Sequence, residues 1–249
     1  MNKNSQNSKV AFSEMFSGVI GREYDMLKLI CPLATEMSRL VGNAVEQLAS
    51  VNIDPLKVIE LGGGTGITTL AILLANKDLS VASVDNEPTM QSQAQINLSD
   101  WVKEGRLSFS ADDALTALKM VKSNSVDLVA SAYTLHNFEH CYREKVYQEI
   151  FRVLKKGGQF INGDRYGLDD IFLHTQLIQK EVAGYFKVLT KLNKLDVLEH
   201  WIIHLFNDES ENHVMRESVA LQQLKSVGFV DVILSSRLEV NALVTAKKI

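Results

Sequence analysis

The residues best suited to chemistry lie in one short stretch, where an acidic side chain precedes a run of glycines. Glu60 is followed within six positions by Gly62, Gly63, Gly64 and Gly66. Glycine lets the backbone adopt positive φ and lets a ligand approach it closely. Apolar residues precede the acid, and an apolar pattern at helical spacing follows the last glycine, which predicts a strand, a tight turn and a helix. Ligands of open α/β sheets bind at such turns, so the stretch predicts a ligand-binding turn rather than a turn with no ligand.

The residues around these glycines distinguish three kinds of glycine-rich turn. A phosphate-binding P-loop needs Lys after its last glycine, whereas Ile67 follows Gly66. The dinucleotide pattern G-x-G-x-x-G, counted from Gly62 and Gly64, has Ile67 at its third glycine and is incomplete. The pattern acid-x-Gly-x-Gly-x-Gly, which starts at Glu60, is complete. In this the stretch resembles motif I of the class I S-adenosylmethionine (SAM) dependent methyltransferases.

The resemblance implies a cofactor and a fold. The cofactor is S-adenosyl-L-methionine, with Glu60, Gly62, Gly64 and Gly66 as binding residues. SAM carries no phosphate, so the turn needs no lysine, and its sulfonium and ammonium groups favour a nearby carboxylate. The fold is α/β: a three-layer Rossmann-like sheet of seven strands, mostly parallel, with an antiparallel C-terminal strand and a helical cap.

An acidic residue ends the next predicted strand. That strand covers residues 79–85, and Asp85 lies nineteen positions beyond Gly66. An acid about twenty residues past a glycine turn accepts hydrogen bonds from ribose hydroxyls, whereas the competing role is a helix cap. Asp85 is therefore predicted to bind the ribose, with Asn86 beside it. This spacing fits NAD and SAM alike, so it predicts a nucleoside without choosing between them.

Two adjacent acids follow the third predicted strand, residues 106–110. By the family resemblance, a carboxylate here accepts a hydrogen bond from the exocyclic amine of adenine, and Asp112 fits that position better than Asp113. Two acids in this place also make a good helix N-cap. Both residues are retained as cofactor-binding candidates.

The catalytic candidate is a histidine just past the fourth predicted strand, residues 125–132. His136 lies on the cofactor side, and a histidine titrates near neutral pH, so it can take a proton from a hydroxyl or amine acceptor. The alternative is a histidine that packs locally in the loop. Arg165, at the end of the fifth strand, can clamp a carboxylate of the acceptor or pair with a nearby aspartate among Asp164, Asp169 and Asp170.

The remaining substrate candidates lie in helical segments. His200 and His204 stand at i and i+4 on one helix face, which is also metal-ligand spacing. No further ligand is identifiable nearby, so we predict no metal. The two histidines then either contact the substrate or form a satisfied pair on a helix of the cap. Tyr24 is a candidate lid residue by the family resemblance, and its alternative is a core aromatic.

These side chains must be positioned by a sheet with a cap. The pattern predicts an N-terminal helical cap segment over residues 1–50, broken at Pro32, and a SAM-binding domain over 51–249. A helical insert of about 167–210 contains helices 170–192 and 196–206. A helix over 143–154 is expected to precede the fifth strand, with Lys155 and Lys156 at its negative end and Gly157 or Gly158 terminating it. A helix over 217–227 and a hairpin of strands 230–235 and 241–246 close the chain.

Composition limits the partners. The net charge is −4 and the pI about 5.9, which argues against nucleic acid. No signal peptide or membrane span is visible, and Cys31 and Cys141 match no metal or redox spacing. We therefore expect a cytoplasmic protein, compatible with a homodimer, that binds neither membrane nor nucleic acid.

The function predicted is methyl transfer from SAM to a small-molecule or peptide-end acceptor, at oxygen or nitrogen. Two alternatives stay open at this point. One is a SAM-binding protein that does not methylate, because binding motifs and catalytic residues are separable. The other is an NAD-dependent oxidoreductase.

Overall fold

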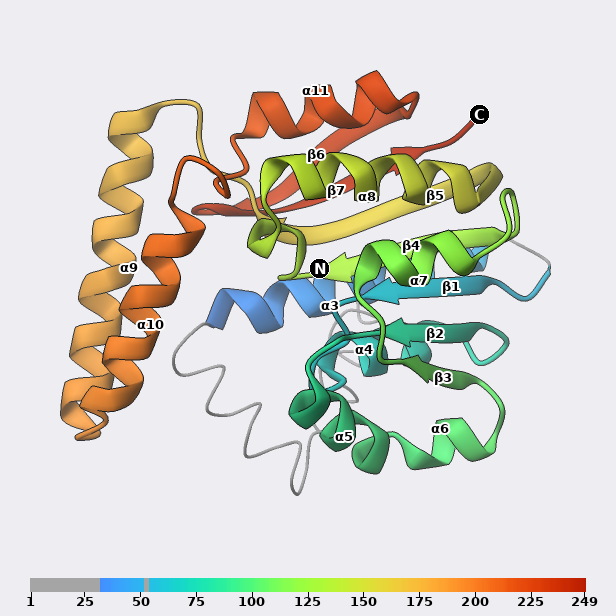
Figure 1. Ribbon diagram of the computed structural model, residues 1–249, viewed down its shortest axis with the longest axis horizontal. Helices are drawn as coiled ribbons and strands as arrows, with labels where there is room; N and C mark the ends of the chain where they lie inside the picture. The colour runs from blue at the N-terminus through green and yellow to red at the C-terminus, as the bar shows by residue number, and fades with distance from the viewer. Residues whose placement is uncertain (1–31, 52–53) are drawn as a thin grey trace.

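The computed structural model describes residues 32–51 and 54–249, so Tyr24 and Cys31 lie outside the described residues. Its centre is a seven-stranded sheet in the order β3-β2-β1-β4-β5-β7-β6 (Figure 1). β1 to β5 are parallel, and β7 enters antiparallel between β5 and β6. The predicted sheet is thus confirmed. The strands are β1 Lys57–Leu61, β2 Ser80–Val84, β3 Leu107–Ser110, β4 Val126–Ala132, β5 Leu154–Arg165, β6 Val230–Leu238 and β7 Asn241–Lys247.

Helices cover both faces of the sheet and make it a three-layer structure (Figure 1). On one face pack α3 (Pro32–Ser50), α4 (Ile67–Ala75) and α6 (Ser99–Lys103), with α5 (Pro88–Asn97) ahead of α6. On the other pack α7 (Ala114–Met120), α8 (His140–Val153) and α11 (Glu217–Val227). Because the central strands are buried on both faces, they form near-continuous apolar runs, as parallel sheets do. No helix among the described residues has the length and apolar character that crossing a bilayer requires.

The described part of the predicted N-terminal segment is a layer of this domain. α3 lies against α4 and β5, and its side chains Met37, Val41 and Val45 are completely buried. It begins at Pro32, which suits the first turn of a helix because its missing N–H has no partner to lose there. The division into a cap at 1–50 and a domain at 51–249 stays a prediction.

The predicted end of α8 is wrong. The sequence favours a helix through Leu154 that the following lysines and glycines terminate, whereas α8 ends at Val153 and Leu154 directly begins β5. Leu154 pairs with Val126 across an irregular register, which extends the strand backwards. Lys155 lies 2.7 Å from Asp127, so a cross-strand ion pair replaces the expected helix-end role of this lysine.

The insert forms two helices, α9 (Ile171–Lys191) and α10 (Leu195–Asp208), beyond the carboxyl ends of β1 and β4 (Figure 1). Tyr185, Leu189, Leu198 and Leu205 give this pair its own small core. Ligands of open α/β sheets bind at the carboxyl ends of the strands. The insert is therefore placed to cover the site.

Candidate active site

The glycine turn is held tightly at the end of β1. The N–H of Gly62 donates to the carbonyl of Val84 on β2 over 2.8 Å, and its φ is +72°. A Cβ at Gly62 would lie 1.9 Å from the Thr134 hydroxyl, so a side chain has no room there. Gly64 also has positive φ, but its Cβ direction is open, which leaves its backbone accessible to a ligand.

Asp85 braces this turn from the end of β2. One carboxylate oxygen accepts from the N–H of Gly64 at 2.7 Å, and the other accepts from Glu87 at 2.8 Å. Each oxygen retains lone-pair capacity for a ribose hydroxyl, and that role stays a prediction. Asn86 is exposed, and Glu87 caps α5, since its side chain accepts from the backbone N–H of Met90.

Glu60 lies beneath the turn rather than in front of it. Its side chain is fully buried and accepts a 2.5 Å hydrogen bond from Thr69, and its Oε1 has no hydrogen-bond partner among the described residues. Burial raises the pKa of Glu60 to about 7, against the opposing hydrogen bond from Thr69. Glu60 does not line the cavity above it. Its position therefore favours support of the turn over the predicted direct contact with the charged groups of SAM.

A cavity of about 470 Å³ lies over the turn. Its volume lies in the usual range for small-ligand sites, about 300–1,000 Å³. The backbone of three consecutive glycines forms one wall, and an orphaned carboxylate oxygen of Glu60 lies below them. No lysine or arginine is among the described residues that line the cavity, so it fits a ligand that carries no phosphate. Further lining residues are Ser38, Thr65, Met90, Tyr133, Val197 and Trp201.

The two acids after β3 have different partners. Asp113 caps α7, since its carboxylate accepts from the backbone of Leu115 and Thr116 and from the hydroxyl of Tyr142. The Thr116 hydroxyl also donates to this carboxylate and is the largest cause, ahead of Tyr142, of a pKa lowered to about 2. Asp112 accepts from the Ser110 hydroxyl at 2.6 Å. The cap occupies Asp113, so the adenine prediction rests with Asp112.

A second, smaller cavity of about 180 Å³ adjoins the first. Ala34, Tyr133 and Trp201 line both cavities. Tyr133 has a φ of +51°, which is rare for an aromatic residue and marks backbone strain of the kind that gathers at functional sites. The two cavities thus meet at Tyr133 and Trp201. A larger cavity of about 930 Å³ lies between α8 and α11, and no predicted site residue lines it.

His136 lies at the floor of the smaller cavity, on the short 3₁₀ helix Leu135–Asn137. Its Nδ1 is 2.6 Å from Asp164, whose carboxylate also accepts from the N–H groups of Leu135 and Arg165. Burial opposes the ionised form of Asp164, but His136 and these donors hold its pKa below the usual value. A carboxylate on Nδ1 fixes the imidazole tautomer and leaves Nε2 facing the cavity.

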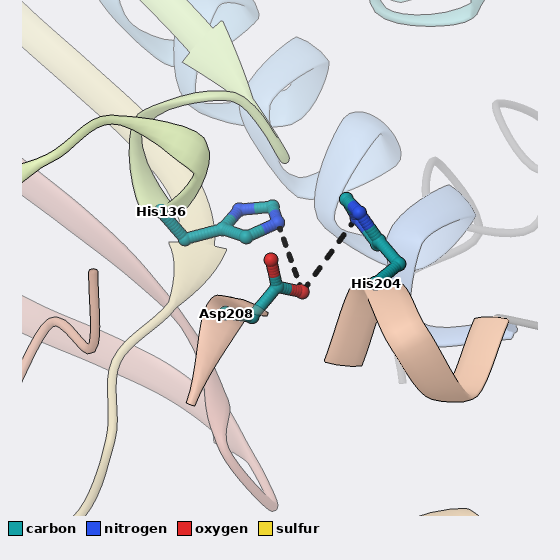
Figure 2. Close-up of side chains that lie close together, drawn as sticks. All are labelled: His136, His204 and Asp208. Carbon is teal, nitrogen blue, oxygen red and sulfur yellow. Dashed lines mark ion pairs between the residues drawn. The ribbon is translucent and has the colours of Figure 1, made fainter. Parts of the chain in front are cut away.

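The two predicted histidines of α10 separate. His204 lines the smaller cavity and lies 3.6 Å from Asp208, one turn further along, whereas His200 is exposed and lines neither cavity. Asp208 is also 3.7 Å from Nε2 of His136 (Figure 2). The structure therefore does not place His200 in the site as predicted, because its position on α10 faces solvent.

Arg165 is paired, as one sequence alternative proposes, but with other partners. It contacts Glu181 of α9 at 2.9 Å and Glu209 after α10 at 3.0 Å, instead of the three aspartates near it in sequence. Burial would lower its pKa, but the two glutamates raise it well above the ordinary value. His174 adds a 2.6 Å contact to Glu209. This buried network fixes the insert over the end of β5.

Sequence reasoning missed the groups that complete this site. Asp164, Glu181, Asp208 and Glu209 were not predicted as site residues. For Asp208 a signal exists, because it lies four positions after His204, the spacing of neighbours on one helix face. For Glu181 and Glu209 no local pattern points to Arg165.

Comparison with known proteins agrees with this architecture. Residues 58–158 match the model of the "Methyltransferase domain" family. The carboxy-S-adenosyl-L-methionine synthase of Campylobacter lari is 25% identical over 193 residues, which cover 76% of this chain and 78% of that protein. The demethylmenaquinone methyltransferase of Leptospira interrogans is 34% identical over 109 residues, or 44% of this chain and 43% of that protein.

A solved O-methyltransferase family protein from Burkholderia thailandensis has the same fold, with a TM-score of 0.64 and 16% identity. The match covers 95% of this chain but 62% of that one, so this chain spans less than two thirds of its length. Together with the sheet order and the glycine turn, these matches identify the class. Residues 58–158 are a methyltransferase domain, and the matches support the class I SAM-dependent methyltransferases, an enzyme family whose cofactor is S-adenosyl-L-methionine. This decides between SAM and NAD, which the spacing of Asp85 leaves open.

Proposed function

We propose that this protein transfers the methyl group of SAM to an oxygen or nitrogen atom of a small-molecule acceptor. The observation that carries the proposal is the pair of adjoining cavities, one over the glycine turn and one over His136. Tyr133 and Trp201 stand where the two meet, so an acceptor in the smaller cavity lies next to a donor in the larger. The rate gain from holding two reactants in line can reach roughly 7–11 kcal/mol.

SAM supplies a methyl group already activated by a positively charged sulfur, so the protein has mainly to align the acceptor and manage its proton. His136 is the proposed catalytic residue. Asp164 holds its Nδ1, so Nε2 can accept a hydrogen bond from an acceptor hydroxyl or amine and direct the attacking lone pair. As the acceptor atom attacks, the proton passes to this nitrogen in the simplest form of the reaction.

The shape and charge of the smaller cavity restrict the acceptor. Its volume of about 180 Å³ is enclosed by three aromatic side chains, Tyr133, Tyr185 and Trp201. Arg165 is the one arginine or lysine among the described residues that line it, and its charge is neutralised by Glu181 and Glu209. A small, neutral or cationic acceptor with an aromatic ring suits this cavity better than an anion. A peptide end, a homodimer and the absence of a nucleic-acid partner stay predictions.

The relatives named carboxy-SAM synthase raise a second candidate, an enzyme that modifies SAM instead of using its methyl group. The product of those enzymes carries an added carboxylate, which needs a cation beside the reacting carbon. Among the described residues, the guanidinium of Arg165 is already paired with Glu181 and Glu209, which counts against this reaction.

The test is product analysis by mass spectrometry. The protein is incubated with SAM and a panel of small phenols, aromatic amines and aliphatic amines, and S-adenosylhomocysteine and methylated acceptor are measured together. We expect both to form in equal amounts with at least one aromatic acceptor. Recovery of unchanged SAM with every acceptor, despite tight binding of S-adenosylhomocysteine, would overturn the proposal. Glu144→Gln, in the groove between α8 and α11, is the control variant.

A further inference from the structure

Three side chains at the floor of the smaller cavity aim their free atoms at one point (Figure 2). These are Nε2 of His136, Nε2 of His204 and Oδ2 of Asp208. The two nitrogens lie 3.7 Å and 3.6 Å from the oxygen, and all three atoms fall within 4.8 Å of one another. These separations are too long for direct hydrogen bonds. The groups therefore converge without satisfying one another.

The separations match those of a metal site before it closes on its ion. Bond lengths of about 2.0–2.2 Å in a tetrahedral zinc site place its ligand atoms about 3.3 Å apart. The histidines need to approach Asp208 by only a few tenths of an ångström to reach that nitrogen-to-oxygen spacing, and the two nitrogens, which lie within 4.8 Å of each other, would close around the ion as well. His204 and Asp208 stand one turn apart on α10, and the short loop after β4 supplies His136.

Asp208 adds an independent sign of a missing cation. Its side chain is 5% exposed, and its Oδ1 has no hydrogen-bond partner among the described residues. A buried carboxylate with an unpaired oxygen is costly unless a cation or a donor meets it. Arg165 lines the same cavity, and its guanidinium is paired with Glu181 and Glu209, whose two negative charges offset its positive charge near Asp208.

The environment of His136 is the second-shell arrangement that metal sites use. A metal-bound histidine almost always donates its other ring N–H to a carboxylate or carbonyl, which orients the ring and makes it a better ligand. Asp164 accepts from Nδ1 of His136 at 2.6 Å and is itself held by the N–H of Leu135 and the amide of Asn162. The ring therefore presents Nε2 in a fixed direction.

We propose that His136, His204 and Asp208 bind one divalent transition-metal ion of the zinc class, with an open coordination position toward the acceptor. Two imidazoles and one carboxylate are a ligand set for Zn²⁺ or Fe²⁺ rather than for Mg²⁺, which prefers oxygen ligands. Three protein ligands with a free position are the arrangement of catalytic sites, since structural zinc sites use four.

This inference rests on the proposed function and changes one step of it. With an ion present, Nε2 of His136 is a ligand, and the metal lowers the pKa of an acceptor hydroxyl bound to it. The hydroxyl proton passes to solvent, and the oxygen forms its bond to the methyl carbon. The bond from that carbon to sulfur breaks with its electron pair left on sulfur, which gives S-adenosylhomocysteine.

The test is calorimetric titration of the chelator-treated, full-length protein with Zn²⁺. We expect one site per chain in the wild type, with affinity at least about a hundredfold weaker in His204→Ala and Asp208→Asn. His200→Ala, which removes the exposed histidine one turn earlier on α10, is the matched control and should bind as the wild type does. Affinity for S-adenosylhomocysteine, measured on all four proteins, should be unchanged and shows that each is folded.

The outcomes separate the two proposals. A wild type that binds S-adenosylhomocysteine but no Zn²⁺, or Zn²⁺ binding that His204→Ala and Asp208→Asn leave intact, overturns the metal site. So does loss of Zn²⁺ binding in His200→Ala, because it would assign the ion to the His200 and His204 pair. If methyl transfer continues in the presence of a chelator, the metal proposal is overturned, and His136 remains the proposed base. If the protein binds Zn²⁺ tightly but methylates no acceptor, the proposed function is overturned and the metal site stands.

Discussion

The two cavities of this protein are built in different ways. The cofactor cavity has one wall of backbone, formed by Gly62 to Gly64, and Asp85 braces this wall from the end of the next strand. The acceptor cavity is made mainly of side chains that come from the segment after β4, from β5 and from the insert, and several of them meet in buried ion pairs. The first needs a particular backbone path, and the second needs several buried charges to be satisfied at once. The comparison predicts that changes on the acceptor side alter chemistry and cap stability, whereas changes on the cofactor side alter affinity for the nucleoside.

The largest expected effect is on turnover, from His136→Gln. It should lower kcat by about 10²–10⁴-fold, the usual contribution of a positioned proton-transfer group, and should leave the affinity for S-adenosylhomocysteine unchanged. Steady-state kinetics with the best acceptor and calorimetry with S-adenosylhomocysteine measure the two quantities. If affinity falls as far as kcat, the two cavities are not separable and the comparison fails.

Next comes Arg165→Met, which removes the cation that ties the insert to β5. The variant leaves the half-buried Glu181 and Glu209 without the guanidinium, and the cost should lie below the about 3–5 kcal/mol of a fully buried pair, because both glutamates are partly exposed and His174 still contacts Glu209. Urea denaturation should show this loss, and limited proteolysis should cut first within α9 or α10. The double variant Arg165→Met with Glu181→Gln is the control, and it should recover part of the stability. Equal stability of Arg165→Met and wild type would show that the insert is held by its apolar contacts.

A smaller effect, on the cofactor side, concerns pH and Glu60. The native pKa is about 7, above the usual 4.5, so between these values the native state holds a proton that the unfolded chain has lost. Stability from this group is therefore full below pH 4.5 and is lost as the pH rises through 7. The shift corresponds to about 3 kcal/mol.

Glu60→Gln cannot ionise and should remove this loss. The difference in unfolding free energy between Glu60→Gln and wild type, measured at pH 5 and pH 8, should move by about 3 kcal/mol in favour of the variant. A difference that stays constant over this range would show that Glu60 is ionised in its buried position.

The smallest expected effect is that of Asp85→Ala. It removes a charged acceptor of hydrogen bonds from Gly64 and from the proposed ribose, and such bonds contribute about 1.5–3 kcal/mol. Affinity for S-adenosylhomocysteine should fall about tenfold to a hundredfold. Asp112→Ala, tested beside it, measures the proposed adenine contact, and Asp113→Ala should instead act on the stability of α7. Unchanged affinity in Asp85→Ala would remove the ribose contact.

Much of the fold follows from local pattern. The helix predicted over 217–227 is α11 with the same ends, because a period of apolar residues and a terminal glycine are enough to define it. The predicted end of α8 fails, since a register irregularity between β4 and β5 turns the expected helix end into strand. That pairing involves residues from distant parts of the chain, and no local rule contains it.

The sequence alone determined a glycine turn for a nucleoside cofactor and the layered sheet, because a run of glycines, an acid at a strand end and apolar periodicity are requirements on adjacent residues. Only the tertiary structure decided which groups meet over the acceptor. His136 and Asp164 are 28 positions apart, and Arg165 and Glu209 are 44 apart. Residue type alone does not indicate which of these groups will pair. Burial also decided the place of Glu60 under the turn and of His200 at the surface, since side-chain direction depends on what packs against each element.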